Sequence, residues 1–164
     1  MSTVTRTDSQ AAETADQARP RIVVGVDGSD PSRQALRWAQ RLAAGAGARI
    51  EAVIAWQYPV ATGWGAAAVP LDYDLEKEME KVLTDTVDTV FGTDWPADLK
   101  LTVTEGHPAS VLLERCAGAL MLVVGSRGHG GFLGLLLGSV SAHVAEHAHC
   151  PVLVVHGDQL PDAI

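Results

Sequence analysis

Residues 120–140 read LMLVVGSRGHGGFLGLLLGSV, an apolar run that passes into a stretch rich in glycine. The apolar part, Leu120 to Val124, is short and consists of residues that favour a strand buried on both faces. We expect a helix over Ser139 to His147 directly after the glycines. A buried strand, a glycine-rich connection and a helix in this order are typical of the ligand-binding end of an α/β protein.

Strand and helix patterns alternate along the rest of the chain in the same way. Further strands are expected over Arg21–Val26, Arg49–Trp56, Leu99–Thr104 and Val152–His156, and further helices from Asp30 to about Gly45, over Asp72–Phe91 and over Pro108–Ala117. Asp30 can cap the first helix, with Pro31 at its first position. This alternation predicts one α/β domain with a five-stranded parallel sheet in the order 3-2-1-4-5 and helices on both faces.

Length and composition set the domain boundaries and narrow the class of protein. The 164 residues suit one domain, which we place at residues 21–157, after a polar, disordered lead-in (1–20) and before a short tail (158–164). The net charge of −8 disfavours nucleic acid and anionic membranes as partners. No apolar run reaches membrane-spanning length, and residues 1–20 lack the apolar centre of a signal peptide. We therefore expect a cytoplasmic protein.

Two strand ends mark the expected ligand site. In the order 3-2-1-4-5 the first and fourth strands are neighbours at the point where the strand order reverses, and ligands of such sheets bind there. Asp27 follows the first strand and Gly125 ends the fourth. Asp27 has a second interpretation as a residue that only forms the turn or caps the next helix.

The glycine-rich stretch has the chemistry of a phosphate site. Gly125, Gly128 and Gly138 allow backbone N–H groups to approach an anion closely, and the next helix adds its positive dipole end. Ser139 can cap that helix or give its hydroxyl to a phosphate oxygen. Arg127 is the sole arginine or lysine after Arg115, so the stretch has one fixed positive charge.

Two familiar phosphate-binding patterns are excluded by spacing. A Walker A loop needs a lysine, and no lysine occurs beyond Lys100. The dinucleotide pattern G-x-G-x-x-G needs glycine at position 133, which is Leu133, and it usually follows the first strand. A surface loop that binds nothing remains an alternative, although the apolar residues 132–137 do not suit a plain linker.

The spacing that does fit is G-x-x-G-x(9)-G-[ST], formed by Gly125, Gly128, Gly138 and Ser139. It resembles the ATP-binding signature of the universal stress protein family. Three further matches occur in the same order, namely VGVDGS at 24–29, SVS at 139–141 and CPV at 150–152. The resemblance covers residues 21–156.

The resemblance implies an ATP site at the carboxyl end of the sheet. Its residues would be Gly25, Asp27, Ala55, Gly125, Ser126, Arg127, Gly128, His129, Gly130, Gly138, Ser139 and Val140. Asp27 would contact the adenine or ribose end, Ala55 would offer a backbone contact to adenine, and the loop would hold ribose and phosphates. Since one arginine cannot neutralise ATP, Mg²⁺ or Mn²⁺ is expected to arrive with the nucleotide.

The function predicted from these residues is a nucleotide-dependent stress or signalling protein with at most slow ATP hydrolysis and no catalytic residues. A true ATPase or adenylyl-transferring enzyme is one alternative, although Gly25 to Ser29 do not match the S-G-G-x-D-S segment of synthetases on a related scaffold. An interaction module that has lost its ligand is another.

Four side chains near the end of the chain raise the question of a metal. His143, His147, His149 and Cys150 could face one ion, but histidine is also favoured at helix ends, so we assign no protein-bound metal there. Cys116 and Cys150 have no recognisable metal or redox spacing and are expected to be reduced thiols. The apolar last strand, Val152 to Val155, would lie at a sheet edge, and together with the family resemblance it predicts a homodimer.

Overall fold

The computed structural model describes residues 19–58, 74–128 and 137–157. Its elements in chain order are β1 (Arg21–Gly25), α2 (Asp30–Ala46), β2 (Arg49–Trp56), α3 (Leu75–Phe91), β3 (Lys100–Glu105), α4 (Pro108–Arg115), β4 (Met121–Gly125), α5 (Ser139–His147) and β5 (Val152–Val155). The five strands form one parallel sheet in the order β3-β2-β1-β4-β5. The predicted topology is therefore confirmed, with strand ends shifted by at most one residue. The predicted lead-in and tail lie almost wholly outside the described residues.

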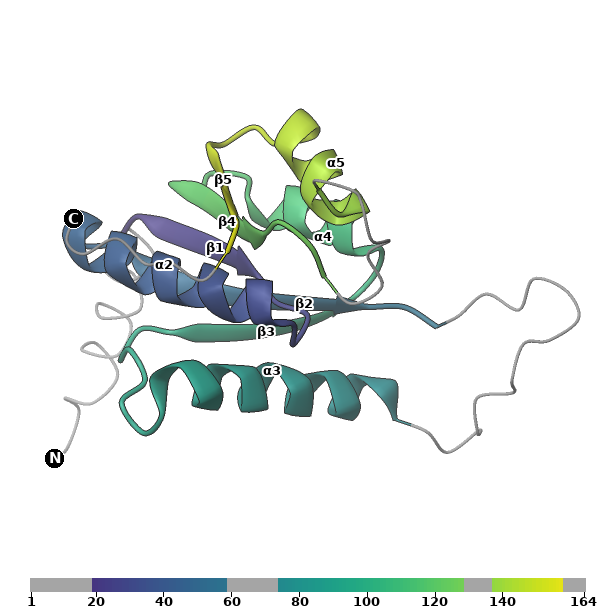
Figure 1. Ribbon diagram of the computed structural model, residues 1–164, viewed down its shortest axis with the longest axis horizontal. Coiled ribbons are helices and arrows are strands. Elements are labelled where there is room, and N and C mark those ends of the chain that lie inside the picture. Colours follow the sequence, from purple (N-terminus) through teal and green to yellow (C-terminus); the bar gives the residue numbers. More distant parts are fainter. Residues whose placement is uncertain (1–18, 59–73, 129–136, 158–164) are drawn as a thin grey trace, which may run out of the picture.

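The sheet lies between two pairs of helices, α2 with α3 on one face and α4 with α5 on the other (Figure 1). Successive side chains of a strand point to opposite faces, and both faces are buried here. In β1, Ile22 and Val24 pack with α2 and α3, whereas Val23 packs with α4 and α5. All three are fully buried, which explains why the strand is a continuous apolar run.

The connection from β1 to α2 differs from the sequence prediction at the helix cap. The N-cap is Ser29, whose hydroxyl accepts from the Ser32 N–H at 3.4 Å, while Asp30 is the first helical residue and Pro31 the second. Ser29 takes this role because its hydroxyl also donates to Asp27 Oδ1 at 2.5 Å, which holds it in place. The prediction of Asp30 as the cap was wrong by one residue.

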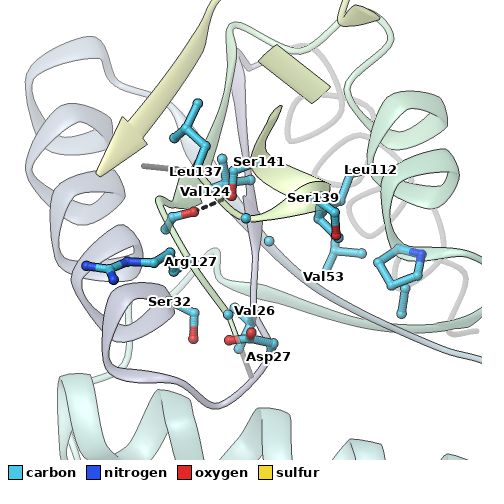
Figure 2. Close-up of a pocket in the computed structure, with 17 residues that line it drawn as sticks. Val26, Asp27, Ser32, Val53, Leu112, Val124, Arg127, Leu137, Ser139 and Ser141 are labelled. Atoms are coloured by element: carbon cyan, nitrogen blue, oxygen red, sulfur yellow. Dashed lines mark hydrogen bonds between the residues drawn. The ribbon is translucent and has the colours of Figure 1, made fainter. Parts of the chain in front are cut away.

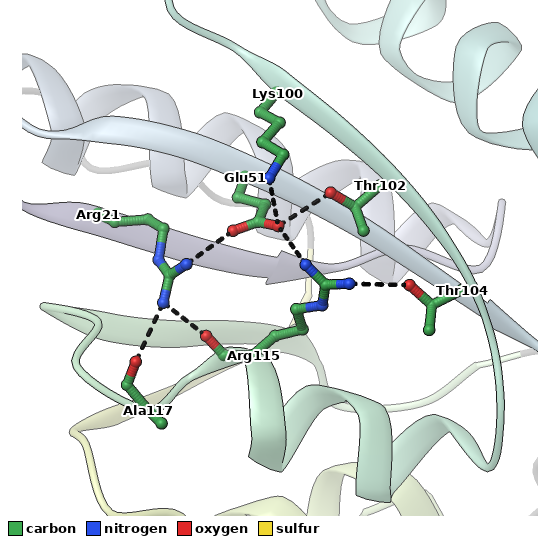
Figure 3. A network of polar contacts seen from close by, with 7 residues as sticks. All are labelled: Arg21, Glu51, Lys100, Thr102, Thr104, Arg115 and Ala117. Carbon is green, nitrogen blue, oxygen red and sulfur yellow. Dashed lines mark hydrogen bonds and ion pairs between the residues drawn. The ribbon is translucent and has the colours of Figure 1, made fainter. Parts of the chain in front are cut away.

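One carboxylate is buried near the amino ends of the strands, at the opposite end of the sheet from Asp27 and Gly125. Glu51 in β2 is fully buried and pairs with Arg21, Lys100 and Arg115, at 3.1, 3.6 and 3.4 Å. Thr102 donates a further hydrogen bond to it at 2.9 Å (Figure 3). A buried charge needs this degree of compensation, so the cluster joins β1, β2, β3 and α4 at one point.

Cys116 is buried and Cys150 is half-buried, and the two form no disulfide in the structure. Among the described helices, none combines the length and apolar character that crossing a membrane requires.

Candidate functional site

A cavity of about 410 Å³ opens where β1, β2 and β4 end, beside the first turns of α4 and α5 (Figure 2). This is the crevice beside β1 and β4 that the strand order predicts. Nine of the residues named from the sequence line it: Gly25, Asp27, Ala55, Gly125, Arg127, Gly128, Gly138, Ser139 and Val140. Segments that are separated by as much as 115 positions in the sequence are thus brought to one cavity.

Of the remaining three residues, the structure describes Ser126. Ser126 is buried and does not line the cavity; its N–H donates to the Val155 carbonyl at 2.8 Å, and its carbonyl accepts from the Gly138 N–H at 2.7 Å. It therefore joins β4, β5 and the start of α5 through its backbone. His129 and Gly130 lie outside the described residues.

The two glycines at the strand ends are required by close packing. A Cβ on Gly125 would lie 2.6 Å from Cβ of Pro31 and 2.7 Å from its carbonyl carbon, so α2 could not approach β4. A Cβ on Gly25 would lie 3.0 Å from Leu112 Cδ1 and 3.2 Å from Val124 Cγ1. Gly25 also borders the cavity, so a side chain there would both crowd α4 and fill the floor of the site.

Asp27 has a structural contact as well as a place in the cavity wall. Its Oδ1 accepts from the Ser29 N–H at 3.0 Å and from the Ser29 hydroxyl at 2.5 Å, which forms the turn into α2. A Cβ on Gly128 would collide with Oδ2 of the same carboxylate. The turn-forming interpretation is therefore correct for one oxygen, while the other oxygen faces the glycine loop.

Three helices begin beside the cavity. Ser32, Pro108 and Ser139, from the first turns of α2, α4 and α5, all line it, so three helix N-termini converge there. At α5 the N-cap is Gly138, which has no side chain, so the prediction that Ser139 could be the cap was wrong. The first residues of α5 line the cavity, and among the described residues no side chain accepts a capping hydrogen bond from their amides.

Ala55, where an adenine contact is expected, lies in the part of β2 that extends beyond the end of β1. The Val26 N–H donates to the Val53 carbonyl at 2.8 Å, and β1 has ended at Gly25. Since β2 continues to Trp56, Ala55 extends past its β1 neighbour and lines the cavity there. Backbone polar groups beyond the end of a partner strand are available to a ligand.

Side-chain charge is scarce in this cavity. Among the described residues that line it, Asp27 and Arg127 alone carry ionisable side chains. Figure 2 shows the Arg127 side chain pointing away from Ser139 and Val53. The arrangement offers hydrogen bonds and helix dipoles to an anionic ligand rather than acid–base groups.

Several lining residues were not found from the sequence. Pro108 and Leu112 come from α4 and Val53 comes from β2, and Val53 and Leu112 belong to the same apolar cluster. Val53 stands two positions before Ala55 and so shares its face of the strand, a signal that the alternation of β2 carries. The α4 residues have no such signal, because their place depends on how α4 packs on the sheet.

A family model described as "Universal stress protein family" matches residues 18–156. The chain belongs to the universal stress protein family. Among its relatives is a universal stress protein of Mycolicibacterium smegmatis, 35% identical over 148 residues, a match that covers 84% of this chain and 48% of the relative. The chain spans about half the length of the curated relatives it matches.

Solved structures of the universal stress protein family have the same fold. One is the crystal structure of a universal stress protein in complex with cAMP, with 29% identity and a TM-score of 0.62, covering 85% of this chain and 98% of that one. A universal stress protein of Archaeoglobus fulgidus in complex with dAMP has a TM-score of 0.59 over 84% of this chain and 98% of that one. At 20% identity the second likeness supports the fold alone.

Proposed function

We propose that this universal stress protein binds an adenine nucleotide in the cavity, and that the nucleotide is ATP with Mg²⁺ or Mn²⁺. The observation that carries the proposal is the convergence of three helix N-termini on a cavity poor in side-chain charge. Backbone N–H groups and helix dipoles favour phosphate there. The universal stress protein crystallised with cAMP, an adenine nucleotide, supports the same class of ligand.

The two ends of the cavity suit the two ends of this nucleotide. The apolar wall formed by Val53 and Leu112 suits a flat base, and Ala55 offers backbone hydrogen-bonding groups beside it. The first amides of α5 and the loop at Gly128 suit phosphates. Because Arg127 is the one cationic side chain among the described lining residues, a divalent cation that binds the phosphates would balance the remaining charge.

Hydrolysis is proposed to be slow at most. Asp27 is the one carboxylate among the described lining residues, and one of its oxygens is engaged by Ser29. A general base has to reach the attacking water, and the described lining residues include no second carboxylate and no histidine to orient it. Rapid metal-dependent turnover that disappears in a Gly128→Ala variant would contradict this part of the proposal.

The biological role we propose is that of a cytoplasmic stress-response or signalling protein whose partners depend on the bound nucleotide. We further propose a homodimer formed along β5. This strand lies at one edge of the sheet, and its four residues are Val152, Leu153, Val154 and Val155. An apolar edge strand leaves backbone groups that a second copy can pair. Sedimentation at micromolar concentration tests the dimer, and a strictly monomeric protein would contradict it.

The nucleotide is best identified by denaturing the purified protein and separating what it releases by chromatography. Released ATP would support the proposal, AMP or pyrophosphate would favour an enzyme, and an empty site would be followed by calorimetric titration with ATP, AMP and cAMP. No heat of binding for any of the three would contradict nucleotide binding.

A Gly138→Ala variant tests whether the cavity is the site. A Cβ there would make only ordinary contacts, 3.5 Å to Arg127 Cα and 3.6 Å to the Ser126 carbonyl oxygen, so the fold tolerates it. The methyl group would stand over the loop where phosphate approaches, and we expect at least a tenfold loss of affinity, which is about 1.4 kcal/mol. Gly45→Ala, in open space on α2, is the matched control and should bind as the wild type does.

A further inference from the structure

Two histidines of α5 lie against each other on the outside of the protein. The ring centroids of His143 and His147 are 4.5 Å apart, and the ring planes are inclined by 58°. The residues are four apart, so they occupy neighbouring positions on one side of the helix. Both side chains are exposed, and neither lines the nucleotide cavity.

This geometry is suited to holding one metal ion between the rings. Imidazole nitrogens bind zinc at about 2.0–2.1 Å, and rings this close need only small side-chain rotations to place one nitrogen each at that distance. The helix already fixes the backbone, so little conformational entropy is lost. Residues 143–147 read HVAEH, which has the H-x-x-E-H spacing of the zinc-binding helix in one class of metallopeptidases.

The surrounding charge favours a cation. His147 is the last residue of α5, where the helix dipole presents its negative end. Glu146, an exposed carboxylate, has its Oε2 3.8 Å from His147 Nε2. Together with the net charge of −8, these groups lower the electrostatic cost of bringing a divalent ion to this surface.

We propose that His143 and His147 form a bidentate site for a divalent late transition metal ion, such as Zn²⁺, Ni²⁺ or Cu²⁺, with water completing the coordination. These ions accept imidazole ligands, whereas Mg²⁺ and Ca²⁺ require oxygen ligands. The site is therefore separate from any metal that enters with a nucleotide, and it does not depend on nucleotide binding.

The site is for binding and not for peptide hydrolysis. In residues 19–58, 74–128 and 137–157, no group of three or more histidine, cysteine, aspartate or glutamate side chains is placed to hold a metal. A catalytic zinc site has three protein ligands and a sheltered open position. The sequence spacing alone did not justify a metal here; the distance between the two rings is what the structure adds.

The test uses the full chain without a polyhistidine tag, titrated with NiCl₂ while amide NMR signals are recorded. We expect paramagnetic broadening centred on residues 143–147 that saturates near one equivalent. His143→Ala and His147→Ala should each weaken binding by at least about tenfold, since loss of a group that merely orients a ligand already costs 10–100-fold. These exposed helical positions accept alanine without loss of fold.

His149→Ala is the matched control, because it removes a neighbouring exposed histidine that is not one of the pair. It should leave the nickel affinity unchanged, as should Cys150→Ser, and MgCl₂ at the same concentration should produce no shift at residues 143–147. The proposal is overturned if nickel causes no localised broadening, or if His149→Ala or Cys150→Ser abolishes binding while His143→Ala does not.

Discussion

The hydroxyl of Ser141 donates a hydrogen bond to the carbonyl oxygen of Gly125, with 2.6 Å between the two oxygens. The bond joins the first turn of α5 to the last residue of β4, and Figure 2 shows it beside the cavity. Ser141 is buried, and Gly125 packs against Pro31 of α2. Together with the backbone bond from the Gly138 N–H to the Ser126 carbonyl, this bond holds the N-terminus of α5 against the end of β4.

We expect Ser141→Ala to lower the free energy of unfolding by about 1–2 kcal/mol, because the buried Gly125 carbonyl loses this donor. Nucleotide affinity should fall as well, since the backbone bond of Gly138 to Ser126 alone then holds the α5 amides less firmly at the cavity. Urea unfolding and calorimetry measure the two effects. The control is Ser110→Ala, an exposed hydroxyl of α4. An unchanged urea midpoint for Ser141→Ala would show that this bond contributes nothing.

The sequence predicts those parts of the fold that a single physical rule determines. Strands covered on both faces must be apolar throughout, so β1 and β4 and their order around the crevice could be predicted from residues 21–26 and 120–124. The helix cap was missed by one residue because Asp27, Ser29 and Asp30 can all act as caps, and only the contact between the first two decides. Local preference could not resolve that choice.

Other parts of the site depend on packing between distant segments. Leu112 reaches the cavity because α4 packs over β1 and β2, and nothing in residues 108–115 indicates this. Glu51 stands in a strand that is otherwise apolar apart from its first residue, Arg49. Its partners come from three other elements, so sequence alone could not show how the buried charge is compensated.

Two glycines at the C-terminal end of α2, Gly45 in its last turn and Gly47 at its C-cap, should respond in opposite ways to alanine. Gly45 is exposed within the helix and has open space around it, so Gly45→Ala should raise the free energy of unfolding by about 0.5–1 kcal/mol. Gly47 ends the helix at φ +59°, so Gly47→Ala should lower it by about 1–2 kcal/mol. Thermal unfolding of the two variants checks both signs, and a stabilised Gly47→Ala would contradict the assigned C-cap.

Glu51→Gln should destabilise the protein, because Arg21 and Arg115 lose the charge that compensates them. Breaking a fully buried pair costs about 3–5 kcal/mol, but these cationic side chains are partly exposed, and water can hydrate them in part, so we expect about 2 kcal/mol. Urea unfolding measures the loss. Glu114→Gln, an exposed carboxylate on α4, is the control and should change stability by less than about 0.5 kcal/mol. Equal effects of the two substitutions would contradict the role of the cluster.

The Cys150 thiol should be unreactive at neutral pH. Burial, and then the neighbouring Cys116 thiol, raise the pKa of Cys150 to about 11. The thiolate, which is the reactive form, is therefore on the order of a thousandth of the population at pH 8, against roughly a quarter for an ordinary cysteine of pKa about 8.5. Iodoacetamide labelling followed by mass spectrometry should be slow at pH 8 and accelerate about tenfold per pH unit toward pH 11.

The same shift links Cys150 to stability at alkaline pH. Because its folded-state pKa lies above the unfolded value, the neutral thiol favours the folded state below about pH 8.5, and this contribution is lost as pH rises toward 11. Cys150→Ser removes the titrating group, so its stability should decline less steeply than that of the wild type over this interval. The prediction is contradicted if the free energy of unfolding of the two proteins declines equally with pH, or if native Cys150 is labelled rapidly at pH 8. Either result would show that the thiol is not held in its neutral form.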